Sequence, residues 1–350
     1  MTEPAERATP PAGPAGLIGR RPTPSTERLL ADLVPPRHFA AATFDTFRPD
    51  PAHPSQAAAR ERLRDVAARV VAGHAAGRRW RLGRAPAPAA VYLDGGFGVG
   101  KTHLLAALAH AVGPTTAYGT FVEYTHLVGA LGFAATVEAL ATHPLVGIDE
   151  FELDDPGDTV LMSRLLRELG DRGVALAATS NTVPGALGEG RFAADDFRRE
   201  IQGLAGRFEV LRVDGPDFRH RSTAGPAPAL SDDDVRRAAR AVPGATLDPF
   251  VGLLDHLATV HPSRYGALLD GVDLVALTGA HEVTSEDMAL RLVVLVDRLY
   301  DRDVPVLLGG PGASTLFGQR MLTGGYRKKY YRALSRLREL TETGRALAAR

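Results

Sequence analysis

The sequence contains no cysteine and has no net charge. Without cysteine, the chain cannot form disulfide bonds, zinc sites built on thiolates or cysteine nucleophiles, and it fits a reducing, intracellular compartment. With 41 basic and 41 acidic side chains, no overall charge attracts the chain to nucleic acid or to an anionic membrane. Composition therefore argues against a nucleic-acid partner and leaves only local patches to consider.

Long hydrophobic runs are also missing. The longest apolar stretches, such as residues 290–296, are interrupted by charge well before the roughly 20 residues that a membrane-spanning helix requires. The N-terminus is rich in Pro, Ala, Gly and Arg and lacks the continuous apolar core of a secretory signal. The sequence therefore predicts a soluble protein of the cytoplasm without a transmembrane segment.

What is present is a globular composition and one conspicuous stretch. The chain has 350 residues, enough for two or three domains. Residues 89–93 are apolar, residues 94–102 are rich in glycine, and residues 103–109 favour a helix, so this stretch predicts a strand, a loop and a helix. Within it, Gly95, Gly100, Lys101 and Thr102 fit G-x-x-x-x-G-K-[ST], the phosphate-binding loop.

This loop has the chemistry of a triphosphate site. Glycines let backbone N–H groups turn toward the phosphates, and the N-terminus of the following helix adds partial positive charge. We expect Lys101 to reach the β- and γ-phosphates and Thr102 to complete the shell of a Mg2+ ion. The alternative is a tight glycine turn without a ligand. The predicted nucleotide-binding residues are Gly95, Gly96, Phe97, Gly98, Val99, Gly100, Lys101, Thr102 and His103.

An acidic pair follows a later apolar run. Residues 145–148 predict a buried strand, and Asp149 and Glu150 come directly after it. Because parallel strands end at the same edge of a sheet, this pair is expected beside the phosphate-binding loop. There Asp149 can hold Mg2+ and Glu150 can accept the proton of the attacking water. The alternative is that the carboxylates only cap the next helix.

Two further features lie downstream. Residues 173–180 predict another buried strand, followed by Asn181, which fits a sensor between the γ-phosphate and the attacking water; the alternative is an asparagine that starts a turn. In ring-forming ATPases an arginine finger lies in the following segment and stabilises charge at a neighbour's γ-phosphate. Each arginine alone is more typical of a solvated surface. The candidates are Arg191, Arg198, Arg199 and Arg207.

The elements together predict an α/β fold, a P-loop NTPase core of three layers with a parallel five-stranded sheet. We expect a disordered tail at residues 1–24, a helical segment flanking the nucleotide site at 25–88, the ATPase core at 89–222, and a helical lid with a small α/β extension at 229–350. The extension is expected to contain strands near 271–277 and 304–308 with a helix at 285–300 between them.

Two flanking segments leave alternatives open. The residues Phe47, Pro49, Pro54 and Gln56 are candidates for an adenine pocket, or they only dock the helix expected at 55–75 on the core. Residues 326–337 are basic with interleaved tyrosines. We interpret them as a solvated helix docked by its Leu and Tyr side, with a membrane or nucleic-acid face as the alternative.

The loop, the acidic pair and the strand that ends in Asn181 come in an order that resembles AAA+ ATPases. A narrower resemblance is to the ZapE family of cell-division ATPases, whose mitochondrial relatives act in protein quality control. The stretches that carry it are 47–51 with 54–56, 95–102, 148–151, 178–181, 213–215, Tyr265, 299–301 and 334–337. The segments 118–124 and 188–199 match that family poorly, which leaves the identity of any arginine finger undecided.

The resemblance implies ATP and Mg2+ as ligands, hydrolysis of the β–γ phosphoanhydride, and Lys101, Glu150 and Asn181 as the catalytic group. It implies Arg336 or a nearby basic residue as a C-terminal contact to the nucleotide or to a neighbouring copy. It also implies remodelling of FtsZ-based division machinery and loose association with the inner membrane face. A homo-oligomer is a further expectation. The alternative is a nucleotide-gated adaptor that clamps a partner or nucleic acid and turns over slowly. Glu150 favours hydrolysis, because a switch that only binds needs no base beside Asp149.

Overall fold

The computed structural model describes residues 15–75, 89–96, 98–151, 156–182, 203, 206–216 and 229–349. The chain divides into two compact units. The core unit comprises Pro24–Thr223, and the terminal unit comprises Met1–Thr23 together with Ala224–Arg350. The chain therefore passes between the units twice. Among the described residues, no helix has the length and apolar character needed to cross a membrane.

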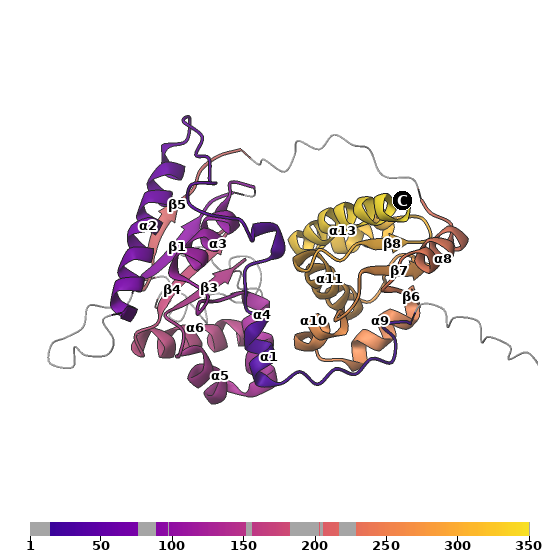
Figure 1. Cartoon of the computed structure of the whole chain (residues 1–350), viewed down its shortest axis with the longest axis horizontal. Helices are drawn as coiled ribbons and strands as arrows, with labels where there is room; N and C mark the ends of the chain where they lie inside the picture. Colours follow the sequence, from indigo (N-terminus) through magenta and orange to yellow (C-terminus); the bar gives the residue numbers. More distant parts are fainter. Residues whose placement is uncertain are drawn as a thin grey trace, which may run out of the picture. The chain divides into compact units, whose positions relative to one another are not determined.

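The core unit is built on a five-stranded parallel sheet (Figure 1). Its strands are β1 (Ala90–Asp94), β2 (Ala117–Thr120), β3 (Leu145–Asp149), β4 (Ala175–Ser180) and β5 (Glu209–Arg212). They lie in the order β2-β3-β4-β1-β5. Asp94 pairs in register with Ser180, and Thr120 with Asp149, so the carboxyl ends of the strands meet at one edge. The predicted parallel sheet is confirmed.

Helices cover both faces of this sheet, which makes the predicted three layers. One apolar cluster joins the sheet to α2 and α3, and another joins it to α4, α5 and α6. Because both faces are buried, β1, β3 and β4 read as nearly continuous apolar runs. The elements are α1 (Thr26–Ala31), η1 (Arg37–Phe39), α2 (Pro54–Ala75), α3 (Lys101–Val112), α4 (Phe121–Leu131), α5 (Phe133–Leu140) and α6 (Pro156–Asp171).

The terminal unit has its own parallel sheet of three strands, β6 (Ala245–Pro249), β7 (Leu274–Thr278) and β8 (Val306–Leu308), in that order (Figure 1). Its main core lies between this sheet and α9, α11 and α13, and a smaller core lies under α8. The remaining elements are α8 (Asp232–Ala241), α9 (Phe250–Thr259), η6 (Pro262–Arg264), α10 (Tyr265–Leu268), α11 (Glu286–Asp301), η7 (Ala313–Thr315), α12 (Gln319–Thr323) and α13 (Arg327–Ala348).

The terminal unit differs from expectation in two places. Residues 229–265, expected as a helical lid, also contain the strand β6. Its five residues include Asp248 and Pro249, which disfavour strands, so pairing with β7 rather than local propensity forms it. Of the disordered tail expected at residues 1–24, residues 1–14 lie outside the described residues, and Leu17 is fully buried in the core of this unit. The sequence does not indicate this burial, because one leucine among Pro, Gly and Arg residues makes no apolar pattern.

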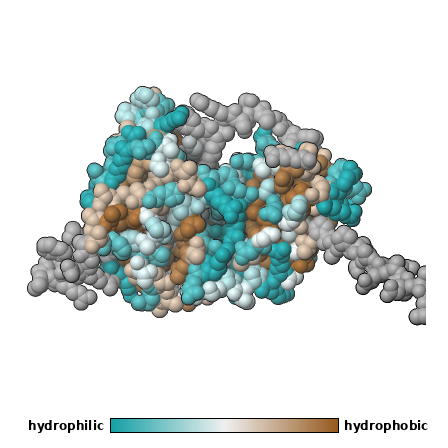
Figure 2. All heavy atoms as spheres, in the orientation of Figure 1, coloured by the Kyte–Doolittle hydropathy of each residue, from teal (hydrophilic) through white to brown (hydrophobic). Residues whose placement is uncertain are grey.

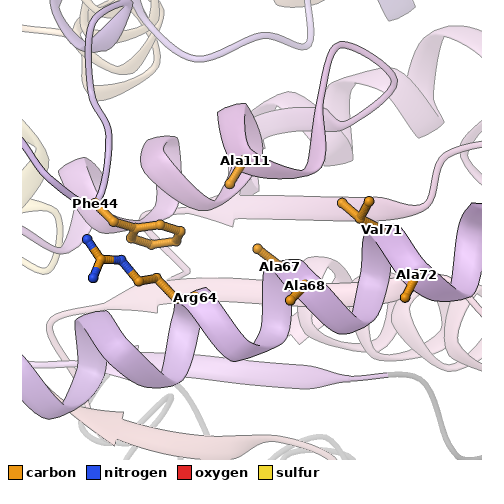
Figure 3. A pocket seen from close by; sticks show the side chains of 7 residues that line it. All are labelled: Phe44, Arg64, Ala67, Ala68, Val71, Ala72 and Ala111. Atoms are coloured by element: carbon orange, nitrogen blue, oxygen red, sulfur yellow. The ribbon is translucent and has the colours of Figure 1, made fainter.

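The surface mixes hydrophilic residues with small hydrophobic patches. The face in Figure 2 is largely hydrophilic with smaller separate hydrophobic patches, as expected where most apolar side chains lie in cores. A shallow apolar groove of about 470 Å3 lies between α2 and α3, with Phe44 and Arg64 at one end and Val71 and Ala111 among its lining residues (Figure 3). Ala111 lies near the C-terminal end of α3, whereas the glycine-rich loop precedes the start of that helix.

Candidate nucleotide-binding site

The glycine-rich loop joins β1 to α3 by a path that only glycines allow. Gly98 and Gly100 have φ values of 68° and 93°, in the left-handed region that side chains disfavour. A Cβ atom on Gly95 would lie 2.1 Å from the backbone oxygen of Val213, the residue that follows β5. The loop is therefore held close to the adjoining chain. Phe97 lies outside the described residues, and Val99 is buried beneath the loop.

Lys101 begins α3 and is almost fully buried. Its Nζ donates hydrogen bonds to the backbone oxygens of Gly95 and Gly96, at 2.7 and 2.5 Å, and to Oδ1 of Asn181, at 2.8 Å. These neutral acceptors hold the ammonium against the loop. A phosphate oxygen is a stronger, charged acceptor and would compete for the same N–H donors.

Asp149 ends β3 as a buried carboxylate with three hydroxyl donors around it. Thr102 Oγ1 donates to Oδ1 at 3.3 Å, and Tyr118 OH donates to Oδ2 at 3.0 Å. The Thr179 hydroxyl also donates to Oδ1. A threonine hydroxyl and a carboxylate side by side provide oxygen ligands of the kind that Mg2+ accepts alongside phosphate and water. The described residues contain no cluster of three or more His, Asp or Glu that would form a complete metal cage by itself.

Glu150 follows with an unusual backbone. Its φ is 54°, which is uncommon for a residue other than glycine. Its N–H lies 3.1 Å both from Oδ1 of Asp149 and from Oγ1 of Thr179. The next residue, Phe151, is buried, and its N–H donates to the Thr179 backbone oxygen at 2.7 Å. The turn is therefore fixed on both sides, and strained conformations of this sort concentrate at functional sites.

The strand order explains how these groups meet. Because β4 lies between β1 and β3, its carboxyl end separates the loop from the acidic pair and touches both. Asn181 accepts from Lys101, and Thr179 donates to Asp149. The sequence singled out Asn181 but not Thr179 or Tyr118. The signal for Thr179 was a hydroxyl residue near the end of the strand that precedes Asn181.

The segment proposed for an adenine pocket packs behind the loop. The Phe47 ring would lie 2.6 Å from a Cβ on Gly100, and it packs against the His103 ring with centroids 5.6 Å apart. The Gln56 side chain accepts from the Asp50 N–H at 2.8 Å and donates to the Asp214 backbone oxygen at 2.7 Å. These contacts dock the segment on the core beside the loop, and the adenine pocket stays a prediction. His103 Nε2 lies 3.1 Å from Thr46 Oγ1.

Of the arginine candidates, only Arg207 is described within the core unit. Arg191, Arg198 and Arg199 lie outside the described residues. Arg207 pairs with Asp171 at 3.6 Å. Arg336 bonds to the buried Asp297 within the terminal unit, and its guanidinium lies 5.0 Å from the centre of the Tyr300 ring. Asp297 and Tyr300 both belong to α11.

Comparison with protein-family models finds a match to one family. A family model described as AFG1-like ATPase matches residues 23–235 and 226–346. No curated protein matches the chain.

Several solved structures are similar over about half of the chain. The DnaC helicase loader is 18% identical, over 51% of this chain and 99% of its own, with a TM-score of 0.35. DnaI is 18% identical, over 54% and 98%, with a TM-score of 0.40. AMPPCP-bound DnaA from Aquifex aeolicus is 15% identical, over 50% of each chain, with a TM-score of 0.38. Since the family match covers nearly the whole sequence and the phosphate-binding loop lies in the expected fold, this protein belongs to the AFG1-like ATPase family.

Proposed function

We propose that the protein hydrolyses ATP with Mg2+ and uses the cycle to remodel a protein partner. The observation that carries the proposal is the junction at the end of β4, where Lys101 meets Asn181 and where Asp149 meets Thr102 and the turn at Glu150. Lys101 would bind the β- and γ-phosphates, and Asp149 and Thr102 would hold Mg2+. Glu150 would accept the proton of the attacking water, while Asn181 orients that water against the γ-phosphate.

Hydrolysis is favoured over an adaptor that only binds nucleotide. A binding switch needs the loop and a metal site but no general base. Here the half-buried Glu150 follows the metal-binding candidate directly, and its backbone is held in a strained conformation by Asp149 and Thr179. Strained backbone conformations concentrate at functional sites, so the strain at Glu150 supports a catalytic role for its carboxylate.

The proposed partner is the FtsZ-based division machinery, and the support for it is the family resemblance. The protein would act in the cytoplasm, in peripheral contact with the inner membrane face, as a homo-oligomer in which an arginine of one copy completes the neighbour's site. Arg191, Arg198 and Arg199 remain the candidates for that finger, and Arg336 remains a candidate sensor.

The test uses preformed FtsZ polymers and the full-length protein. Polymer mass, followed by light scattering and sedimentation, is expected to fall with wild type and ATP but not with Glu150→Gln and ATP. A non-hydrolysable ATP analogue serves as the matched control for binding without turnover. Equal effects of wild type and Glu150→Gln would contradict coupling to hydrolysis, and unchanged polymers with an active enzyme would exclude FtsZ as the substrate.

A further inference from the structure

Residues 16–20 pack on the terminal unit, and their hydrogen-bond partners there lie more than two hundred positions away in sequence. Both oxygens of the buried Asp248 carboxylate, near the end of β6, accept backbone N–H groups from this segment. Leu17 N–H donates to Oδ2 at 2.7 Å, and Ile18 N–H donates to Oδ1 at 3.1 Å. Among the described residues, these are the hydrogen bonds that the structure gives this carboxylate.

Three further contacts hold the segment. The Leu17 side chain is fully buried and belongs to the main apolar cluster of this unit. Arg20 donates to the backbone oxygens of Leu268 and Asp270, at 2.9 and 3.2 Å, and its own backbone oxygen lies 2.9 Å from His256 Nε2. A Cβ on residue 16 would lie 2.2 Å from Asp248 Oδ1, so an alanine there would displace this carboxylate from its N–H donors.

The core of the terminal unit does not depend on this segment for more than one side chain. Apart from Leu17, every buried member of its main apolar cluster lies between Phe250 and Leu340. The segment contributes one side chain and no helix or strand. It runs from Asp248, near the carboxyl end of β6, to the backbone oxygens of Leu268 and Asp270, which precede β7. Its contacts are of the kind that a bound peptide makes. Its backbone N–H groups donate to a carboxylate, and one of its side chains is buried among apolar residues.

We propose that the terminal unit carries a binding site for a short peptide folded in a tight turn, and that residues 16–20 of the same chain occupy this site as an exchangeable ligand. The Arg20 N–H closes the turn by donating to the Leu17 backbone oxygen at 3.1 Å, and Gly19 has a φ of 90°. The peptide it takes has glycine at the Asp248 carboxylate, leucine for the pocket, and arginine three positions after that leucine. Asp248 is the main recognition group, because it binds two consecutive N–H groups of the ligand backbone.

The test is performed on the full chain. Leu17→Asp should displace the segment, since a carboxylate cannot enter the apolar pocket beside Asp248, and should leave the site open. A fluorescent peptide with the sequence of residues 15–22 is then titrated and its anisotropy measured. We expect it to bind Leu17→Asp at least about tenfold more tightly than wild type, a factor equivalent to about 1.4 kcal/mol. Binding should be lost when Asp248→Asn is added, and a peptide carrying Gly16→Ala should not bind.

Absence of binding to a folded Leu17→Asp protein, or equal binding with and without Asp248→Asn, would overturn the proposal. If Leu17→Asp does not fold, native-state hydrogen exchange of wild type decides. The amides of Leu17 and Ile18 should exchange by local opening at least about tenfold faster than those of Val275 and Leu277 in β7. Exchange of all four at one common rate would show that the segment is an integral part of the fold and not a ligand.

Discussion

Thr179 links the two carboxylate residues of the candidate site. Its hydroxyl donates to Asp149 and lies 3.1 Å from the Glu150 N–H, and its backbone oxygen accepts from Phe151. A single side chain on β4 therefore orients the metal-binding candidate and fixes the turn that carries the proposed base. Such supporting groups commonly matter for activity although they do not touch the substrate.

Thr179→Val should lower kcat about 10- to 100-fold, because the isosteric side chain keeps the packing but releases both neighbours. Affinity for a fluorescent ATP analogue should change little, since the loop and Lys101 are intact. Thr179→Ser, which keeps the hydroxyl, should restore most of the activity. A valine variant with wild-type kcat would show that this hydroxyl does not position the site.

Gly95→Ala should destabilise the protein by about 1–3 kcal/mol, because the added methyl group would collide with the backbone at Val213. Gly96→Ala is the matched control in the same loop, since a Cβ there meets no atom within 4 Å. Urea unfolding without nucleotide measures both free energies. Equal effects of the two substitutions would contradict the close contact.

The sequence predicted the parts of the site that depend on consecutive residues. The loop from Gly95 to Thr102 and the acidic pair have a fixed local spacing, and their strands are long apolar runs. Tyr118 and Thr179 were not predicted as neighbours of Asp149, because their contacts depend on the sheet order β2-β3-β4, which no local pattern specifies.

In the terminal unit, an ion-pair cluster joins the helices α11 and α13. Asp297 of α11 bonds to both Arg332 and Arg336 of α13. Burial by itself would raise the pKa of Asp297, but the two guanidinium groups outweigh it and hold the pKa below its ordinary value. The carboxylate is therefore charged in the folded state, and it compensates two cations that pack between the helices.

Asp297→Asn should lower the free energy of unfolding at neutral pH by about 3–5 kcal/mol, because it leaves two partly buried cations without their counter-charge. Because the folded pKa is lowered, the stabilisation is complete above the ordinary aspartate pKa of about 3.9 and is lost as the pH falls through the folded value.

Denaturant unfolding at pH 7 and at acidic pH measures this difference. The gap between wild type and variant should shrink on acidification. Asp255→Asn on the exposed side of α9 is the control and should have little effect at either pH. A gap that stays constant with pH would contradict the charge pairing.

The helix α11 and the strand β6 show where sequence patterns succeed and fail. The helix expected at 285–300 is found at Glu286–Asp301, capped by Ser285, because its apolar periodicity and its cap agree. The strand β6 was missed because Ala245–Pro249 is short and contains two poor strand formers, and only pairing with β7 stabilises it.

Over the full chain, the division into two units has a thermodynamic consequence. Each unit has its own sheet and apolar core, so calorimetry should resolve two unfolding transitions. Saturating ATP should raise only the transition of the core unit, since a ligand at 100 times its Kd stabilises the state that binds it by about 2.7 kcal/mol. Lys101→Ala is the control and should abolish the shift. One cooperative transition that ATP moves as a whole would contradict this division.

The sequence predicted a separate C-terminal domain but not the contribution of the N-terminus to it. Residues up to Thr23 belong to the terminal unit, although their composition is that of a flexible tail. The contacts that place them there, between the Arg20 backbone oxygen and His256 of α9 and between the Leu17 N–H and Asp248, join positions too far apart for any local pattern to indicate.

The most direct test of the account is ATP turnover by wild type and by Glu150→Gln over a range of protein concentrations, with ATP affinity and mass measured in parallel. We expect Glu150→Gln to bind ATP like wild type but to turn over about 10²- to 10⁴-fold more slowly, as loss of a general base predicts. We also expect wild-type specific activity and mass to rise with concentration in the presence of ATP. Slow turnover by a monomer, unchanged by Glu150→Gln, would contradict the account and favour a nucleotide-gated adaptor.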